Sequence, residues 1–121
     1  MAALRHVPLV NASLDEQAGE IVLHDAYHIG IATATAKGLV VPVIRDANRF
    51  DLAGLARECE RLIRAAQAGT LSRDELRGST FTVSSVGNIG GLVSTPIIHH
   101  PEVGIVAIGK VFKRPSYNDA G

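Results

Sequence analysis

Two serines followed by a glycine-rich segment are the residues of this chain best suited to chemistry. Residues 80–83, Thr-Phe-Thr-Val, are β-branched or aromatic and predict a β-strand. Ser84 and Ser85 follow directly, and Gly87 begins a short segment that ends in two further glycines. Glycine lets a backbone approach a ligand closely, and hydroxyl and N–H donors at the rim of a sheet can stabilise an oxyanion. A strand that simply ends in a tight turn is the alternative interpretation.

Other chemistries need spacings that the chain lacks. Residues 87–91 do not read Gly-x-Gly-x-x-Gly and no helical pattern follows them, which argues against a dinucleotide or phosphate loop. His24 and His28 lie four residues apart, and His99 precedes His100. No cysteine or carboxylate with metal-site spacing completes a set of three or four zinc ligands around them. No metal site is therefore expected.

One long helix is predicted between residues 52 and 68. Asp51 is a suitable N-cap, and Gly69 occupies the position of a C-terminal glycine. The apolar residues that recur at helical spacing and form one stripe are Leu52, Leu55, Ala56, Cys59, Leu62, Ile63 and Ala66. Because Cys59 lies on this stripe, we expect its thiol to pack in the core rather than to act as a nucleophile.

Apolar segments on either side of that helix predict strands. The expected strands are residues 20–23, 27–35, 39–44, 80–83, 95–98 and 103–111, with polar turns at 11–16, 18–19 and 36–38. Pro42 has no N–H to donate, so the strand containing it is expected to be irregular or at an edge. A helix tail is expected at residues 2–7, and a capping box at 72–75 predicts a short helix that ends at Gly78. The order predicts an α+β fold, built as an α/β two-layer sandwich.

The composition excludes several classes of function. The 121 residues suffice for one domain, and 12 basic residues balance 12 acidic ones, so nothing predicts binding of nucleic acid. No apolar run approaches the roughly 18 residues of a transmembrane helix, and no membrane partner is expected. Hydrophobic residues make up 46% and aromatic residues only 4%, which favours an aliphatic sheet core covered by helix. The single cysteine cannot form an internal disulfide.

Several motifs along the chain resemble a known catalytic domain. They are Asn-Ala-Ser-Leu-Asp at 11–15, His-Ile-Gly-Ile-Ala at 28–32, Gly-Leu-Val-Val-Pro-Val-Ile-Arg-Asp at 38–46, the strand and glycine segment at 80–91, Thr-Pro-Ile-Ile at 95–98 and Pro-Glu-Val-Gly-Ile at 101–105. In order and spacing, the chain resembles the catalytic domain of the 2-oxoacid dehydrogenase acyltransferases, the dihydrolipoamide acyltransferase (E2) cores of the pyruvate, 2-oxoglutarate and branched-chain complexes. The resemblance implies the CoA-dependent acyltransferase fold, which chloramphenicol acetyltransferase shares.

The same resemblance implies an activity and a set of site residues. The family transfers an acyl group between dihydrolipoamide and CoA, and a serine in its Thr-x-Ser loop stabilises the oxyanion; the matching residue is Ser84. The weaker candidates for substrate contact on the CoA side are Asn11, Ser13, Asp15, Ser85 and Gly87. For the first three of these, ordinary turn chemistry is the alternative. Several family members have serine beside CoA where this chain has Gly109, so that contact is not expected here.

One catalytic residue of the family has no counterpart in the chain. The family's base is a histidine in a His-x-x-x-Asp-Gly motif, and none of the five histidines precedes Asp-Gly at that spacing. The resemblance therefore implies that residues 1–121 form the middle of the catalytic domain, without its N-terminal part and without that C-terminal segment. We expect the chain alone to be inactive.

The family resemblance also implies partners. Its members form homotrimers that build larger hollow cores and work with the E1 and E3 components of the complex. The acyl group arrives on a lipoyl group carried by a separate domain, and CoA is the second substrate. Alanine- and arginine-rich stretches in the long helix favour a bacterial, cytoplasmic protein, with the mitochondrial matrix as the eukaryotic alternative. A noncatalytic trimer-forming scaffold and a free-standing CoA acyltransferase remain alternative functions.

Overall fold

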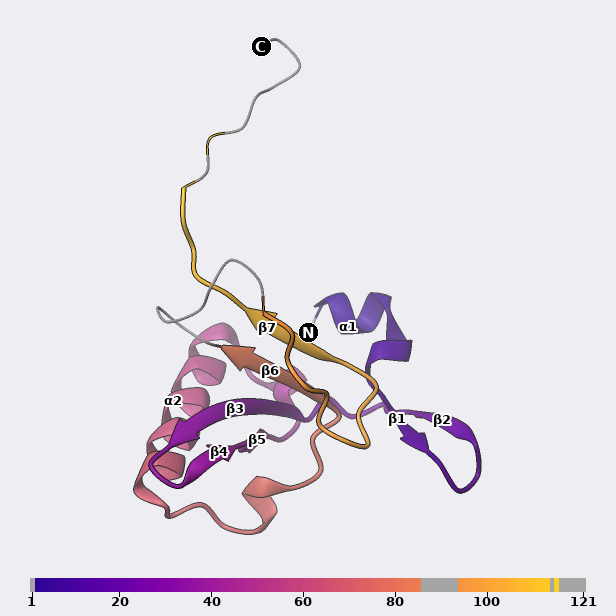
Figure 1. The fold of residues 1–121 in the computed structure, drawn as a ribbon, viewed down its shortest axis with the longest axis horizontal. Helices are drawn as coiled ribbons and strands as arrows, with labels where there is room; N and C mark the ends of the chain where they lie inside the picture. The colour runs from indigo at the N-terminus through magenta and orange to yellow at the C-terminus, as the bar shows by residue number, and fades with distance from the viewer. Residues whose placement is uncertain (1, 86–93, 114, 116–121) are drawn as a thin grey trace.

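The computed structural model describes residues 2–85, 94–113 and 115, and Figure 1 shows their arrangement. The helices and strands are α1 (Ala2–His6), β1 (Ala12–Asp15), β2 (Glu20–Leu23), β3 (Ile29–Thr35), β4 (Gly38–Val40), β5 (Val43–Ile44), α2 (Leu52–Ala68), β6 (Phe81–Ser85) and β7 (Ile105–Ile108). Short 3-10 turns lie at Pro8–Val10, Ala47–Arg49 and Asp74–Leu76. None of the helices in this described part is long and apolar enough to cross a membrane.

The larger sheet surrounds β6 with parallel neighbours. Its strand order is β4-β3-β6-β7, and β5 also pairs with β3. β6 runs parallel to both β3 and β7, whereas β4 and β5 run antiparallel to β3. The connection from β5 to β6 passes through α2, which lies along the sheet in Figure 1. A helix layer on a mixed sheet is the α+β two-layer arrangement that the sequence predicts.

The helix α2 begins and ends where the sequence predicts. The carboxylate Oδ1 of Asp51 accepts a hydrogen bond from the Gly54 N–H at 2.6 Å, and Gly69 ends the helix in the left-handed conformation at φ 70°. Leu62 is completely buried against the sheet. Cys59 packs beside this core, and burial raises the pKa of its thiol. The predicted packing role of Cys59 is confirmed.

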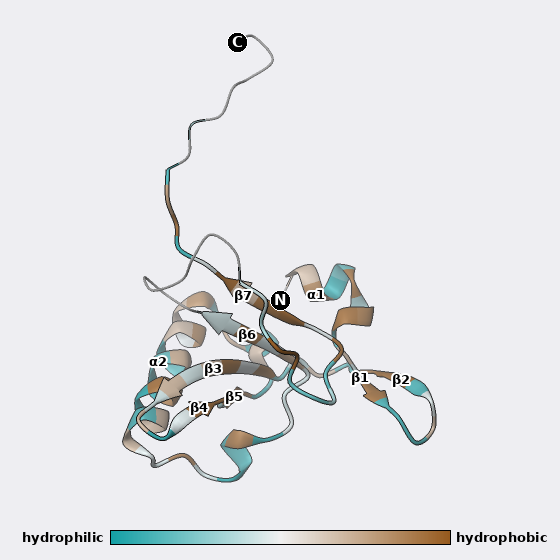
Figure 2. Ribbon diagram, viewed as in Figure 1, coloured by the Kyte–Doolittle hydropathy of each residue, from teal (hydrophilic) through white to brown (hydrophobic). Residues whose placement is uncertain are grey.

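The two faces of β6 differ in character. Phe81 and Val83 pack against the core beneath α2. Because side chains alternate along a strand, Thr82 and Ser84 point to the opposite face of the sheet. In Figure 2, β7 and much of β3 are brown, whereas the end of β6 is pale because threonine and serine interrupt its apolar residues.

A second, smaller sheet corrects one prediction. β1 and β2 form an antiparallel hairpin, so residues 12–15 are a strand and not the predicted polar turn. The segment 101–103 adds to the other edge of β1, through hydrogen bonds from Leu14 N to Pro101 O at 2.8 Å and from Val103 N to Ala12 O at 3.1 Å. Pairing on both edges holds β1 extended despite its turn-forming residues.

Three further expectations change in detail. The strand predicted at 39–44 is divided into β4 and β5 at Pro42, as its missing N–H suggests, and the Pro42 carbonyl accepts from Ile31 N at 2.8 Å. Residues 95–98 include three β-branched residues but form no strand, and β7 is shorter than predicted. The capping box is confirmed, because Ser72 N donates to Glu75 Oε2 at 2.9 Å, but the turn that follows is a 3-10 turn.

Candidate functional site

Ser84 lies near the C-terminal end of β6, on the face opposite α2. Its cross-strand partners are Ala32 on β3 and Ala107 on β7. Both neighbours carry only a methyl group, so space remains around the hydroxyl, and Ser84 is half-buried. Within the described residues, no side-chain hydrogen bond engages the Ser84 hydroxyl. Ser84 therefore presents a hydroxyl group at the end of a strand that is paired on both edges.

The residues that follow Ser84 are only partly described. Ser85 pairs with Ile108 of β7 and is exposed at the end of the strand. Gly87, predicted to contact substrate, lies outside the described residues, as does the rest of the glycine segment. The predicted contribution of that segment to the site stays a prediction.

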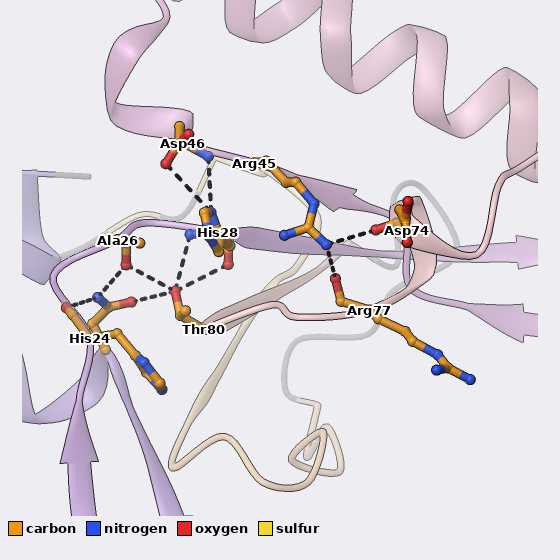
Figure 3. A network of polar contacts seen from close by, with 9 residues as sticks. His24, Ala26, His28, Arg45, Asp46, Asp74, Arg77 and Thr80 are labelled. Atoms are coloured by element: carbon orange, nitrogen blue, oxygen red, sulfur yellow. Dashed lines mark hydrogen bonds and ion pairs between the residues drawn. The ribbon is translucent and has the colours of Figure 1, made fainter.

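Asn11 is buried and lies at the other end of β6, where it is hydrogen-bonded to Thr80. Figure 3 shows its partners His24, Ala26 and Thr80. Its side chain is 1% exposed, and its Nδ2 donates to the carbonyls of His24 at 2.8 Å and Ala26 at 3.0 Å. Its Oδ1 accepts from the Thr80 hydroxyl at 2.7 Å. Asn11 therefore ties the loop before β3 to the start of β6.

The other two CoA-side candidates also contact nearby protein groups. The Ser13 hydroxyl and His24 Nε2 are 2.8 Å apart, and Asp15 Oδ1 accepts from the N–H groups of Gln17 and Ala18, each at 3.0 Å. Asn11 contacts Thr80, whereas Ser84 stands four residues further along the strand, or about 13 Å at 3.3 Å per residue. The structure does not bring the Asn11 network together with Ser84; the substrate roles of Asn11, Ser13 and Asp15 stay predictions.

His28 completes the network of Figure 3 and stabilises the loop after β5. Its Nδ1 accepts a hydrogen bond from Asp46 N at 3.0 Å, and its backbone N–H donates to Thr80 Oγ1 at 3.1 Å. The neighbouring Arg45 donates from Nη2 to the carbonyls of Asp74 and Arg77 at 2.9 and 3.0 Å. These contacts fix three loops around the start of β6.

Four histidines gather around the same end of the sheet. His24, His28, His99 and His100 all line a cavity of about 510 Å³. In the ranges 2–85, 94–113 and 115, no group of three or more His, Cys, Asp or Glu residues is arranged to hold a metal ion. The cavity lies at the start of β6, away from Ser84 at its end.

Comparison with known proteins identifies the architecture. The family model described as 2-oxoacid dehydrogenases acyltransferase (catalytic domain) matches residues 1–121. The chain belongs to this family.

Curated relatives of this acyltransferase-family chain act in two kinds of complex. It is 49% identical over 115 residues to the lipoamide acyltransferase component of the branched-chain alpha-keto acid dehydrogenase complex of Pseudomonas aeruginosa, covering 95% of this chain and 27% of the relative. It is 41% identical over 119 residues to the dihydrolipoyllysine-residue acetyltransferase component of the pyruvate dehydrogenase complex of Staphylococcus aureus, covering 98% and 28%. The chain thus spans about a quarter of these relatives.

Solved structures confirm the expected fold of the acyltransferase family. The dihydrolipoamide acetyltransferase of Azotobacter vinelandii superposes with a TM-score of 0.91 at 37% identity, over 98% of this chain and 49% of that one. A truncated catalytic core of the 2-oxoacid dehydrogenase multienzyme complex from Thermoplasma acidophilum gives a TM-score of 0.88 at 40% identity, over 93% and 53%. The E2-type catalytic fold is therefore shown, and this chain spans about half of each solved core.

In this acyltransferase-family chain, sequence reasoning missed two polar residues: Thr82, which precedes Ser84 by two positions on β6, and its hydrogen-bond partner Glu102. Thr82 and Glu102 are buried, with exposures of 1% and 5%, and their side chains are hydrogen-bonded to each other at 2.9 Å. A threonine in a strand is ordinary, so its type gave no signal. The position of Glu102 directly before the apolar residues 103–108 was the available clue.

Proposed function

We propose that the protein containing this chain transfers an acyl group between dihydrolipoamide and CoA, as the E2 core component of a 2-oxoacid dehydrogenase complex. The observation that carries the proposal is the family match over residues 1–121, with Ser84 of the matching Thr-x-Ser motif at the end of β6. The similarity to both branched-chain and pyruvate components supports this class of reaction without selecting the acyl group.

The proposed role of Ser84 follows from the chemistry of thioester exchange. A base removes the proton of the CoA thiol, and the thiolate attacks the carbonyl carbon of the acyl-dihydrolipoamide. A new C–S bond forms, and negative charge develops on the carbonyl oxygen. The Ser84 hydroxyl donates a hydrogen bond to that oxygen. When the carbonyl re-forms, the bond to the dihydrolipoamide sulfur breaks, and the base returns the proton to that sulfur.

The surroundings of Ser84 suit a donor that acts only when charge develops. Its two cross-strand neighbours are alanines, which cannot compete for its hydrogen bond. Parallel pairing on both edges of β6 fixes the backbone, so the donor needs little reorganisation during the reaction. Ser85, Gly87, Asn11, Ser13 and Asp15 are carried as candidate contacts on the CoA side.

The base of the proposed reaction is not identified among residues 1–121. None of the five histidines matches the family's motif, so we propose that residues 1–121 alone do not catalyse the transfer. The partners proposed with this activity are a homotrimer, a larger core assembly, the E1 and E3 components, and a lipoyl group on a separate domain. A bacterial cytoplasmic location is proposed, or the mitochondrial matrix in a eukaryote.

The test is acyl transfer to dihydrolipoamide by the complete catalytic core, with acetyl-CoA and isobutyryl-CoA as alternative donors. Ser84→Ala should lower kcat by about 10²- to 10³-fold, because it removes one oxyanion donor. The matched control is Ser72→Ala, which changes an exposed serine in the capping box before β6. This variant should keep the wild-type kcat. The preferred donor identifies the acyl class.

Three results would contradict all or part of the proposal. A folded, trimeric core that is silent with both donors favours the noncatalytic scaffold. Rapid transfer to other acyl acceptors but not to dihydrolipoamide favours a free-standing CoA acyltransferase. If the core is active and Ser84→Ala is as fast as Ser72→Ala, the assignment of the oxyanion donor is wrong.

A further inference from the structure

Glu102 carries a buried carboxyl group that takes no part in the proposed acyl-transfer steps. Its side chain is 1% exposed. Its Oε1 accepts hydrogen bonds from the Ser79 hydroxyl at 2.5 Å and the Thr82 hydroxyl at 2.9 Å, and His99 Nδ1 lies 3.3 Å from the same oxygen. Among the described residues, its Oε2 is buried without a partner. A buried, unpaired polar atom costs about 1–3 kcal/mol, so burial of this carboxyl group lowers the stability of the fold.

The backbone of Glu102 fixes where its carboxyl group lies. Residue 102 forms a bridge with Ser13 of β1, and the flanking Pro101 and Val103 are hydrogen-bonded to Leu14 and Ala12. The Glu102 N–H also donates to His99 O at 2.9 Å. The side chain therefore joins β6 to the β1–β2 hairpin, which is otherwise a separate sheet.

Thr82 and Ser84 share one face of β6. They are two residues apart, so their side chains point the same way, and their Cα atoms are about 6.6 Å apart along the strand. Thr82 pairs with Gly30 of β3, and Ser84 pairs with Ala32 two positions on. The Thr82–Glu102 bond thus holds the face of the strand that carries the proposed oxyanion donor.

Gly30 leaves the space in which this contact forms. A Cβ atom added at Gly30 would lie 2.8 Å from Thr82 Oγ1 and 2.7 Å from Val41 Cγ1, both closer than real Cβ contacts. The Thr82 hydroxyl therefore occupies room that a side chain at position 30 would fill. Gly30 on β3 thus leaves room for the Thr82 hydroxyl on β6, and that hydroxyl donates to Glu102.

We propose that Glu102 is a positioning residue for acyl transfer, which acts through Thr82 to hold the strand face that presents Ser84. The inference rests on the proposed role of Ser84 as the oxyanion donor. Glu102 touches neither substrate, and its contribution is geometric: a misplacement of about 1 Å at a reacting group can cost about 10²-fold in rate. The required chemistry is an acceptor oxygen at Oε1, and a neutral amide oxygen satisfies that requirement.

The test compares variants that remove the acceptor or the donor with variants that keep it, all in the complete catalytic core. Glu102→Leu and Thr82→Val each remove the contact and should lower kcat by about 10- to 100-fold, with KM for CoA and for dihydrolipoamide changed little. Glu102→Gln keeps an acceptor oxygen and Thr82→Ser keeps a hydroxyl donor. Both conservative variants should restore kcat to within about three-fold of wild type.

Two controls separate positioning from stability and from the role of Ser84. Leu62→Val loosens the core under α2 and should lower the melting temperature with kcat unchanged. If Thr82→Val lowers the melting temperature as Leu62→Val does and also leaves kcat unchanged, Glu102 is purely structural and the proposal is overturned. Should Glu102→Leu fail to fold, the comparison of Thr82→Val with Thr82→Ser decides the matter alone.

Ser84→Ala, measured in the same series, distinguishes the two proposals. If Ser84→Ala lowers kcat while Thr82→Val and Glu102→Leu keep the wild-type kcat, Ser84 is still assigned as the oxyanion donor. The positioning role of Glu102 is then overturned. A fast Ser84→Ala overturns both, because there is then no donor at position 84 to hold. Slow Ser84→Ala, Thr82→Val and Glu102→Leu variants with a rescued Glu102→Gln support both.

Discussion

Replacing Asn11 by leucine tests the network that ties the start of β6 to the loop before β3. Leucine has the same branched side-chain skeleton but cannot form the three side-chain hydrogen bonds of Asn11, to His24 O, Ala26 O and Thr80 Oγ1. Each bond is worth about 1 kcal/mol net, and the carbonyls of His24 and Ala26 lose the Asn11 donor. We therefore expect Asn11→Leu to lower the free energy of unfolding by about 3 kcal/mol.

The assay is thermal unfolding of the complete catalytic core at one protein concentration. The solved cores are about twice as long as this chain, and in a domain of that size 1 kcal/mol shifts the melting temperature by about 2–4 °C. Asn11→Leu should therefore lower the melting temperature by about 6–12 °C. Ser13→Ala is the control: it removes one partly buried hydrogen bond, to His24, and should lower it by no more than about 4 °C.

A double-mutant cycle with Thr80→Val checks the origin of the effect. Asn11 and Thr80 share one hydrogen bond, so the two substitutions together should cost about 1 kcal/mol less than the sum of the single effects. The reasoning is refuted if Asn11→Leu melts within 2 °C of wild type, or if the two effects are strictly additive.

Three other predictions concern stability and use the same melting assay. Gly30→Ala should destabilise by about 1–3 kcal/mol, because its Cβ meets Val41 and Thr82; an unchanged melting temperature contradicts the close packing. Asp51→Ala should cost about 1 kcal/mol through loss of the helix cap, whereas Asp51→Ser should recover most of it. The backbone N–H of Ser72, and then Arg61, lower the pKa of Glu75 from 4.5 to about 2. The stability that Glu75 contributes is therefore complete above pH 4.5 and lost as the pH falls toward 2, so Glu75→Gln should flatten this acid slope.

Local signals predicted α2 correctly, because its stop and start depend on neighbours in sequence. The Asp51 cap and Gly69 terminate the helix through contacts within one turn. The break at Pro42 was also predictable, since a missing N–H is a property of the residue itself. Features of this kind can be predicted because they depend on residues that are close in sequence.

Elements that depend on distant partners were not predictable in the same way. Residues 12–15 contain turn-forming residues, yet pairing with β2 and with the segment 101–103 makes them a strand. Residues 95–98 have the opposite outcome: they favour a strand but find no strand partner. Intrinsic β preference decides little without a neighbouring strand.

The same distinction between local and long-range contacts applies to the candidate site. Ser84 was identified through the family motif, and the structure shows how β3 and β7 flank it. Glu102 contacts Thr82 across 20 residues of sequence, and no local pattern announces such a contact. Its relation to Ser84 appears only when the strand face is known.

The pairing of β1 with the segment 101–103 constrains the order in which the polypeptide can fold during synthesis. β1 is synthesised before α2 and β6, whereas its outer partner, residues 101–103, is made only after them. Until then the hairpin has one open edge, and Ile21, Val22 and Leu23 of β2 are exposed even in the final structure. Contacts that close so long a loop form slowly. The β1–β2 hairpin therefore completes its pairing only after β3, β4, β5 and β6 have been synthesised.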